Sequence, residues 1–247
     1  MTHQVVQKVG SDHVIHDPRI VDPLPGWVFD PDALASRSLV HATGHGRRQV
    51  WFFALNGHEL VLRHYWRGGI VSRLSADVYV WTGLERTRAF REWRLLAQLH
   101  DRGLPAPRPV AARVQQGTMA YRADLITVAI PGATPFDEVL QGPAAGDRSL
   151  WHRVGLTLGR FHAAGACHAD LNVRNILLDE AGAVWVIDWD RGRLRHPDWR
   201  WQEARLERLR HSLRGQSRLN RAARTGWPAL LAGHAEAVGA LAPPGSP

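Results

Sequence analysis

The stretch that decides the fold is CHADLNVRNILLDEAGAVWVIDWD, at residues 167–190. Its spacing is H-x-D-x-x-x-x-N from His168 to Asn175, followed by two short apolar runs around a glycine-containing turn, and then by Ile-Asp-Trp-Asp. The apolar runs predict the two strands of a hairpin. Asp170 and Asn175 would then share one loop, and Asp188 would follow the hairpin directly.

This set of polar residues is what phosphoryl transfer requires. One carboxylate orients the acceptor hydroxyl and takes its proton, while an amide oxygen and a second carboxylate hold the Mg²⁺ that bridges the ATP phosphates. We therefore predict Asp170 as the catalytic base, and Asn175 and Asp188 as ligands of Mg²⁺. The alternative is that these residues only cap turns between buried strands. Either half of the pattern alone would be weak, but both halves in this order favour the catalytic interpretation.

Composition narrows the class of protein. The 247 residues, 45% of them apolar, suffice for one sizeable folded domain or two small lobes. The formal charge is +8, and 30 of the 31 basic residues are arginine, which indicates either codon bias or a surface that meets phosphate and carboxylate groups. The one lysine, Lys8, lacks the Gly-Lys-Ser/Thr setting of a phosphate-binding P-loop, so P-loop kinases are excluded.

The single cysteine, Cys167, allows no internal disulfide, which suits a reducing compartment. We expect it to be a small buried apolar residue rather than a nucleophile. The N-terminus lacks the pattern of a signal peptide, and no run of 18 apolar residues predicts a membrane-spanning helix.

The motif at residues 168–190, together with the predicted strands and helices, favours an α+β, two-lobed protein-kinase-like fold with four segments. Residues 1–37 are expected to form a loosely structured N-terminal arm with one helical turn, begun by Asp30 and Pro31. Residues 38–128 would form a small antiparallel β lobe with one helix. A larger, mainly helical lobe would follow at 129–238, and a flexible tail at 239–247.

The smaller lobe carries the candidate ATP-positioning residues. Asn56-Gly57, between two apolar runs, predicts a β-hairpin. Gly44 and Gly46 would let the backbone approach a phosphate closely, although two glycines are more often an ordinary turn. The basic residue expected on the third strand falls on Arg63, and Glu92 on the following helix is the acidic residue best placed to pair with it.

Helices are predicted at residues 85–102, 150–164 and 198–216. His162 is expected to cap the end of the second helix. The third is basic and amphipathic, so it fits a helix with a solvated face at least as well as a membrane-surface helix. No long activation segment or Ala-Pro-Glu sequence follows Asp190, which argues against a protein kinase of eukaryotic type.

The chain resembles the lipopolysaccharide kinases of kinase-like fold that phosphorylate 3-deoxy-D-manno-octulosonic acid (Kdo). The resemblance covers most of residues 44–190. LRHYWRGG and CHADLN are its most specific motifs, and the matching stretches lie at residues 44–47, 62–69, 84–96, 103–113, 121–127, 167–172, 175–177 and 187–192.

The resemblance implies ATP-dependent phosphorylation of a Kdo hydroxyl on a Kdo-bearing lipid A precursor, during assembly of the lipopolysaccharide inner core. It also implies a peripheral enzyme at the anionic cytoplasmic face of the bacterial inner membrane, with no nucleic acid and no obligate protein partner. Within that frame, His168 would order the catalytic loop, and Arg174 would face the acceptor or the transferred phosphoryl group. Trp189 and Asp190 depart from the Phe-Gly of protein kinases.

Two alternatives share parts of the pattern. A sugar or aminoglycoside phosphotransferase of the same fold has the same H-x-D-x-x-x-x-N spacing, so only acceptor assays would separate it. A non-enzymatic, basic nucleic-acid-binding protein would account for the charge. It would not account for Asp170, Asn175 and Asp188.

Overall fold

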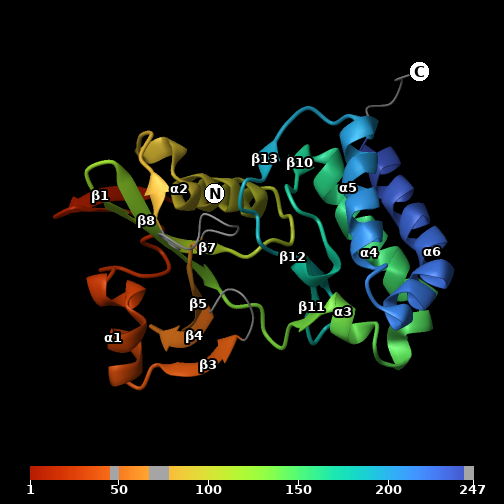
Figure 1. Ribbon diagram of the computed structural model, residues 1–247, viewed down its shortest axis with the longest axis horizontal. Coiled ribbons are helices and arrows are strands. Elements are labelled where there is room, and N and C mark those ends of the chain that lie inside the picture. The colour runs from red at the N-terminus through yellow and green to blue at the C-terminus, as the bar shows by residue number, and fades with distance from the viewer. Residues whose placement is uncertain (45–49, 67–77, 242–247) are drawn as a thin grey trace. The chain divides into compact units, whose positions relative to one another are not determined.

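The computed structural model describes residues 1–44, 50–66 and 78–241 (Figure 1). The chain forms two compact units. Unit 1 comprises Met1–Asp101 and Pro107–Ala129, and unit 2 comprises Arg102–Ala106 and Ile130–Pro247. Unit 1 is built on a sheet and unit 2 mainly on helices, in agreement with the predicted α+β class.

Unit 1 contains one antiparallel sheet in the order β1-β2-β7-β8-β5-β4-β3, with β6 paired to β8 beside this path. The hairpin of β4 and β5 turns at Asn56 and Gly57, which both have positive φ, as the Asn-Gly signal predicted. The strands are β1 (Val5–Val9), β2 (Asp12–His16), β3 (Val40–Gly44), β4 (Val50–Leu55), β5 (His58–His64), β6 (Tyr79–Val80), β7 (Pro109–Gln116) and β8 (Ala120–Val128).

The N-terminal segment differs from the expected loose arm. Residues 5–16 form the β1–β2 hairpin, and β2 pairs with β7, so this segment extends the sheet. The helical turn predicted from Asp30 and Pro31 is present as α1 (Pro31–Ser36), with the Asp30 carboxylate accepting hydrogen bonds from two backbone N–H groups. Together with η1 (Gly26–Phe29), it buries Phe29 and Leu34 in a core shared with the strands. The expectation failed because the polar residues of this segment lie on the exposed face of an edge hairpin.

The helix of unit 1 is α2 (Arg88–Asp101), which follows the 3-10 turn η3 (Leu84–Arg86) and packs on β7 and β8. It begins three residues later than predicted, because residues 84–86 form η3 instead. Its buried face includes Phe90, Trp93 and Leu96, together with the carboxylate of Glu92.

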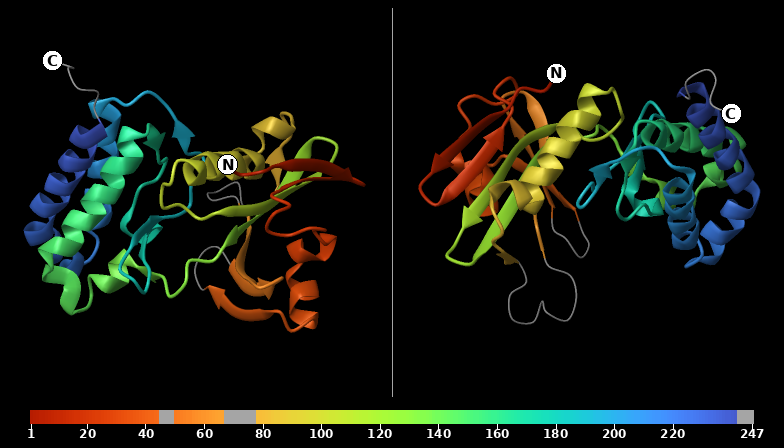
Figure 2. Two further views of the ribbon diagram at one scale, coloured as in Figure 1. Left: turned by 180° about the vertical axis from the view of Figure 1, so that it is seen from behind. Right: turned by 90° about the horizontal axis from the view of Figure 1, so that it is seen from above.

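Unit 2 is dominated by three helices that lie side by side in Figures 1 and 2: α4 (Arg148–Ala163), α5 (Trp199–Ser212) and α6 (Ser217–Leu241). The first two were predicted, whereas α6 was not. Shorter elements connect them: β9 (Thr134–Pro135), α3 (Phe136–Val139), η4 (Pro143–Gly146), β10 (Ala166–Cys167), η5 (Val173–Asn175), β11 (Ile176–Leu178), β12 (Val184–Val186) and β13 (Arg193–Leu194). Residues 239–241, assigned to a flexible tail, belong to α6, and 242–247 lie outside the described residues.

Glycines on both helices, among them Gly155 and Gly233, allow the close packing of α4 against α6. A Cβ at Gly155 of α4 would overlap the carbonyl oxygen of Leu230, and a Cβ at Gly233 of α6 would overlap that of His152. Because these atoms belong to the backbone, they cannot turn aside as a flexible side chain would. The two helices therefore approach each other more closely than any larger residue at either position would allow. Within the described residues, no helix has the length and apolar composition needed to span a bilayer.

Candidate active site

The loop that carries the predicted catalytic residues follows β10 in unit 2. His168 lies at its start and is 2% exposed. Its Nε2 lies 2.9 Å from the carbonyl oxygen of Ile187, and its Nδ1 lies 3.1 Å from the backbone nitrogen of Asp170. The carbonyl can only accept and the backbone N–H can only donate, so the ring carries its proton on Nε2. Burial lowers the pKa of His168, which keeps this neutral form.

Trp189 packs against the His168 ring and against α4. Its indole is 1% exposed, makes an edge contact with the His168 ring at 4.8 Å, and packs on Phe161 of α4 at 4.9 Å. Its Nε1 donates to the carbonyl of Val186 at 2.8 Å. Trp189 therefore contacts α4, the catalytic loop and the strand β12. Its indole is larger than the phenylalanine ring that protein kinases have at this position.

Asp170 is directed away from the core. Its side chain is 59% exposed, and one oxygen pairs with the guanidinium of Arg208 at 2.7 Å. The amide nitrogen of Asn172 lies 3.4 Å from its other carboxylate oxygen. Arg205, one helical turn before Arg208 on α5, donates to the carbonyl of Ala169 at 2.8 Å. Two arginines of α5 thus hold the backbone and the carboxylate of this loop.

Asn175 and Asp188 are brought together by the backbone. The N–H of Ile187 donates to the carbonyl of Asn175 at 2.9 Å, at the end of the β11–β12 hairpin. The amide nitrogen of Asn175 donates to the carbonyl of Asp170 at 3.0 Å, which orients the amide group. Asp188 has a φ of 60°, a conformation that Asp and Asn tolerate better than most residues.

These two side chains fit a magnesium ion by their chemistry. An amide oxygen and a carboxylate are hard oxygen ligands, which Mg²⁺ prefers over nitrogen and sulfur. Because the Asn175 nitrogen is used as a donor to Asp170, its oxygen is the atom left for a metal. In the described part of the chain, no group of three or more His, Cys, Asp or Glu residues forms another candidate metal site.

Arg174 forms an ion pair that the sequence did not predict. Its side chain is 73% exposed, and its Nε donates to the buried carboxylate of Asp137 on α3 at 3.2 Å. Asp137 therefore holds the catalytic loop to α3 through Arg174. Most of the Arg174 side chain is nevertheless exposed to solvent, where an acceptor could reach it.

In unit 1, the expected ion pair between Arg63 of β5 and Glu92 of α2 is formed. The Glu92 side chain is only 2% exposed and also accepts a hydrogen bond from the hydroxyl of Tyr65 at 2.6 Å. Burial raises the pKa of Tyr65 well above its ordinary value, so the phenol remains a donor. Arginine here forms the ion pair that protein kinases make between a lysine of the third strand and a glutamate of the following helix.

Of the two candidate glycines, Gly44 ends β3 and pairs with Val50 of β4. Gly46 lies outside the described residues. Cys167 and His162 were expected to have structural roles. Cys167 is a free and buried cysteine, as predicted. His162 does not cap α4: its Nδ1 lies 2.8 Å from Nε2 of His234 on α6, and burial lowers its pKa to about 3.

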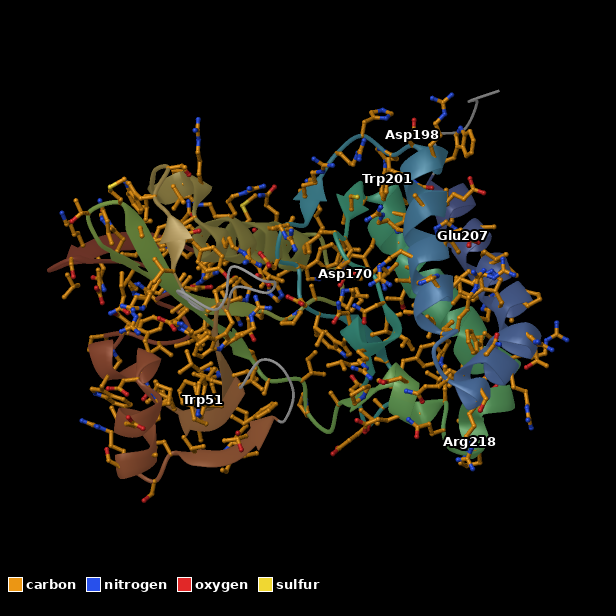
Figure 3. The ribbon with its side chains drawn as sticks, in the orientation of Figure 1. Trp51, Asp170, Asp198, Trp201, Glu207 and Arg218 are labelled. Atoms are coloured by element: carbon orange, nitrogen blue, oxygen red, sulfur yellow. The ribbon has the colours of Figure 1, made fainter. Side chains whose placement is uncertain are left out.

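Arg205 and Arg208 were not anticipated as neighbours of the catalytic loop. The sequence predicted only a basic amphipathic helix here, and both arginines are half-buried on α5. Their spacing of three residues is the signal that a pair of contacts on one face was available. The pattern could not indicate that this face meets Ala169 and Asp170 (Figure 3 labels Asp170 and residues of α5).

Comparisons with known proteins give consistent similarities. The model of the lipopolysaccharide kinase (Kdo/WaaP) family matches residues 32–233. The chain is 40% identical over 186 residues to a 3-deoxy-D-manno-octulosonic acid kinase of Stenotrophomonas maltophilia (strain K279a), covering 75% of this chain and 74% of that protein. It is 44% identical over 187 residues to the kinase of the same name from Xanthomonas axonopodis pv. citri (strain 306), with the same coverage.

A third relative of that name, from Vibrio cholerae, is 37% identical over 188 residues, or 76% of this chain and 79% of that protein. Among solved structures, WaaP in complex with acyl carrier protein superposes with a TM-score of 0.53 at 18% identity, covering 98% of this chain and all of that one. This likeness supports the kinase-like fold.

Proposed function

Because the chain belongs to the lipopolysaccharide kinase (Kdo/WaaP) family, we propose a role in its reaction for each of the residues described above. The protein is a phosphotransferase that phosphorylates Kdo in the biosynthesis of the lipopolysaccharide inner core. ATP is the phosphate donor, as the kinase family implies, and the acceptor is a hydroxyl of Kdo on the Kdo-bearing lipid A precursor.

We propose that Asp170 orients this hydroxyl and takes its proton. The observation that carries this assignment is the exposed carboxylate of Asp170. Its loop is held in place by a hydrogen bond from the Asp170 backbone N–H to the ring of neutral His168. The ion pair of Asp170 with Arg208 would hold the carboxylate in one direction until the acceptor arrives. Most of the rate gain would come from positioning and electrostatics, since phosphoryl transfer asks little covalent work of the protein.

Asn175 and Asp188 are proposed to hold Mg²⁺, which when bound neutralises charge on the ATP phosphates. In unit 1, Arg63 is proposed to contact those phosphates, with buried Glu92 and Tyr65 setting the direction of its guanidinium. Gly44 and Gly46 remain candidates for backbone contact with phosphate, and Arg174 for contact with the acceptor. We assign unit 1 to the N-lobe and unit 2 to the C-lobe of the kinase-like fold.

The protein is proposed to work peripherally at the cytoplasmic face of the inner membrane. Its acceptor is a lipid, and a formal charge of +8 favours an anionic bilayer surface. Co-sedimentation with anionic vesicles, but not with neutral ones, is the expected result. Equal binding to both would contradict the electrostatic part of this proposal.

The decisive experiment measures transfer of labelled phosphate from ATP to Kdo-bearing lipid A precursor. An aminoglycoside and the lipid A precursor without Kdo are the control acceptors. Two variants remove proposed roles, Asp170→Ala and Asp188→Asn, of which the second retains a residue type that tolerates positive φ. Glu207→Ala is the matched control, because Glu207 is an exposed residue of α5 whose single ion pair within the described residues is with Arg210.

We expect label on the Kdo-bearing lipid alone, with turnover lowered by at least ~10²-fold in each site variant and unchanged in the control. Melting temperatures of all variants should stay near that of the unaltered protein. Near-normal turnover of Asp170→Ala would contradict its assignment. Label on the aminoglycoside instead would keep the reaction class and change the acceptor.

A further inference from the structure

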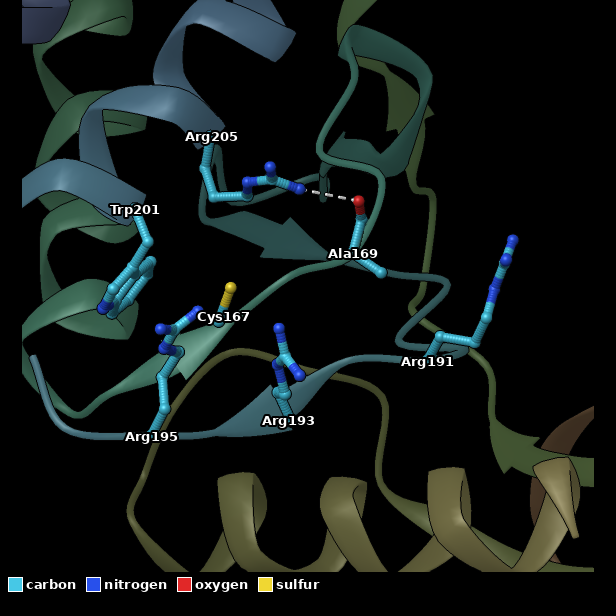
Figure 4. A pocket seen from close by; sticks show the side chains of 7 residues that line it. All are labelled: Cys167, Ala169, Arg191, Arg193, Arg195, Trp201 and Arg205. Carbon is cyan, nitrogen blue, oxygen red and sulfur yellow. Dashed lines mark hydrogen bonds between the residues drawn. The ribbon is translucent and has the colours of Figure 1, made fainter. Parts of the chain in front are cut away.

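Unit 2 contains a cavity of about 220 Å³ that is lined mainly by cationic side chains (Figure 4). The described residues of its lining include no carboxylate; they are Cys167, Ala169, Arg191, Arg193, Arg195, Trp201 and Arg205. Arg193, Arg195 and Arg205 bring guanidinium groups to this space, whereas the Arg191 side chain lines its edge and extends away from the other three (Figure 4). Like charges that lie close together repel one another, and an anion among them would remove that repulsion. The positive charge of the lining therefore favours an anionic ligand.

No carboxylate among the described residues neutralises these arginines. In the ranges that the structure describes, none of these four guanidinium groups lies within ion-pair distance of a carboxylate. Arg205 donates through Nη1 to the carbonyl of Ala169, but its Nε is buried and has no hydrogen-bond partner. A buried donor without a partner is costly, and a ligand oxygen would satisfy it.

The cavity is directly attached to the catalytic loop. Ala169 of its lining immediately precedes Asp170, and Cys167 ends strand β10, which pairs with β13. In that pairing Cys167 lies opposite Arg193. An anion bound here would lie against residues that are one and three positions before the proposed catalytic base in the chain.

The size of the cavity limits what it can enclose. Pockets that enclose a whole small molecule usually measure ~300 Å³ or more. A space of about 220 Å³ suits one charged group with part of the sugar that carries it. The indole of Trp201 lines one side, with the guanidinium of Arg195 5.6 Å from its ring centre, and offers a flat apolar wall. Arginine forks match the oxygens of phosphate and carboxylate groups.

We propose that this cavity, defined by Arg191, Arg193, Arg195 and Arg205, binds an anionic oxygen group of the acceptor glycolipid and so places the reacting hydroxyl beside Asp170. The inference rests on the proposed function for the identity of the acceptor. Phosphate and carboxylate share the chemistry that the arginines recognise, and the acceptor carries both. The experiment is arranged to separate these two sources.

The test variant is Arg193→Gln combined with Arg195→Gln. Both side chains are exposed at the cavity and make no hydrogen bond to the catalytic loop, so the loop should remain intact. Arg205 is left unchanged because it holds Ala169. Arg218→Gln is the matched control, since it removes the same charge from an exposed position at the start of α6, away from the cavity lining (Figure 3).

Steady-state kinetics are measured against the Kdo-bearing lipid and against ATP. We expect the double variant to raise the KM for the lipid by roughly tenfold for each arginine removed, which corresponds to about 1.4 kcal/mol per arginine. The KM for ATP should not change, and Arg218→Gln should match the unaltered protein. An unchanged lipid KM, or an equal rise for ATP and lipid, would overturn the proposal.

A lipid acceptor with its phosphates removed separates the two sources. If the cavity holds a phosphate, the unaltered protein should have a higher KM for this acceptor than for the phosphorylated one. The KM of the double variant should be the same for both acceptors. If the cavity holds the Kdo carboxylate, the double variant should show the same relative defect with both acceptors. Either result supports the site, and a defect with neither acceptor refutes it.

A binding measurement keeps this proposal separate from the proposed function. Inorganic phosphate, without ATP or lipid, should raise the melting temperature of the unaltered protein and of Arg218→Gln more than that of the double variant. If the unaltered protein transfers no phosphate to the Kdo-bearing lipid, the proposed function fails, while this difference still decides whether the cavity binds anions. An equal shift in all three proteins would exclude the cavity as an anion site.

Discussion

Acid should destabilise the packing of α4 against α6 through one histidine pair. The His162 side chain is buried and its Nδ1 lies 2.8 Å from Nε2 of His234, so a single proton lies between these two nitrogens. A second proton would place two N–H donors against each other. Burial, first, and then His234 lower the pKa of His162 from 6.5 to about 3.

The pKa of His162 is lower in the folded chain than in the unfolded chain, and this sets how stability depends on pH. The unfolded chain takes up a proton near pH 6.5 and the folded chain only near pH 3, so the unfolded chain binds more protons between these values. Stability therefore rises with pH across this window and is lost as the pH falls below 6.5. At about 1.4 kcal/mol per pH unit, lowering the pH from 6.5 to 5 should cost about 2 kcal/mol.

The assay is denaturant unfolding at about pH 7 and about pH 5, for the unaltered protein and for His162→Asn. Asparagine keeps a polar group near the position of Nδ1 but does not titrate, so the variant should lose about 2 kcal/mol less between the two pH values. His211→Asn, at an exposed position of α5, is the control and should behave as the unaltered protein. The same pH dependence in all three proteins would refute the reasoning.

Three further predictions concern packing and the two candidate site regions. Gly233→Ala should destabilise the protein by about 2 kcal/mol because its Cβ would overlap backbone atoms of α4. Gly239→Ala, which has open space around it, should be neutral or stabilising. Denaturant unfolding measures both effects. Arg63→Met should cost about 3 kcal/mol by removing the partner of buried Glu92, and adding Glu92→Leu should restore much of that loss. Arg208→Gln should lower kcat roughly tenfold with an unchanged KM for ATP, while unfolding shifts by no more than about 1 kcal/mol, since the ion pair is exposed.

Each of these has a clear contrary outcome. Equal unfolding energies for the two glycine variants would mean that α6 moves freely relative to α4. Additive losses in the double variant of Arg63 and Glu92 would remove the case for coupling between these side chains. Unaltered kcat in Arg208→Gln would make its contact with Asp170 incidental to turnover, and a matched Arg210→Gln variant controls for the loss of charge on α5.

The sequence was most informative where a residue type has few other uses. Asn-Gly between apolar runs predicted the β4–β5 turn, and the H-x-D-x-x-x-x-N spacing placed Asp170 and Asn175 on one loop. The pairing of Arg63 with Glu92 followed from their positions on a strand and the next helix. In each case the physical constraint is local or depends on a single pair of elements.

The failures arise where distant segments decide the outcome. The β1–β2 hairpin is exposed along most of β1, so its composition resembles that of a loose arm until its pairing with β7 is known. His162 is at the end of a helix, as a capping residue would be, but the burial supplied by α6 gives it a different partner. The grouping of four arginines in one cavity likewise depends on the pairing of β10 with β13.

The contact between Gly155 and α6 also has a consequence for synthesis on the ribosome. α4 leads directly into the catalytic loop, yet its closest helical neighbour is encoded at the far end of unit 2. At ~5–20 residues per second, roughly 4–16 s pass between the emergence of Ala163 and that of Leu241. During that interval the glycine-lined face of α4 and the buried Trp151 have no α6 to cover them. The helix that leads into the catalytic loop would therefore gain its full packing only after residue 241 has been synthesised.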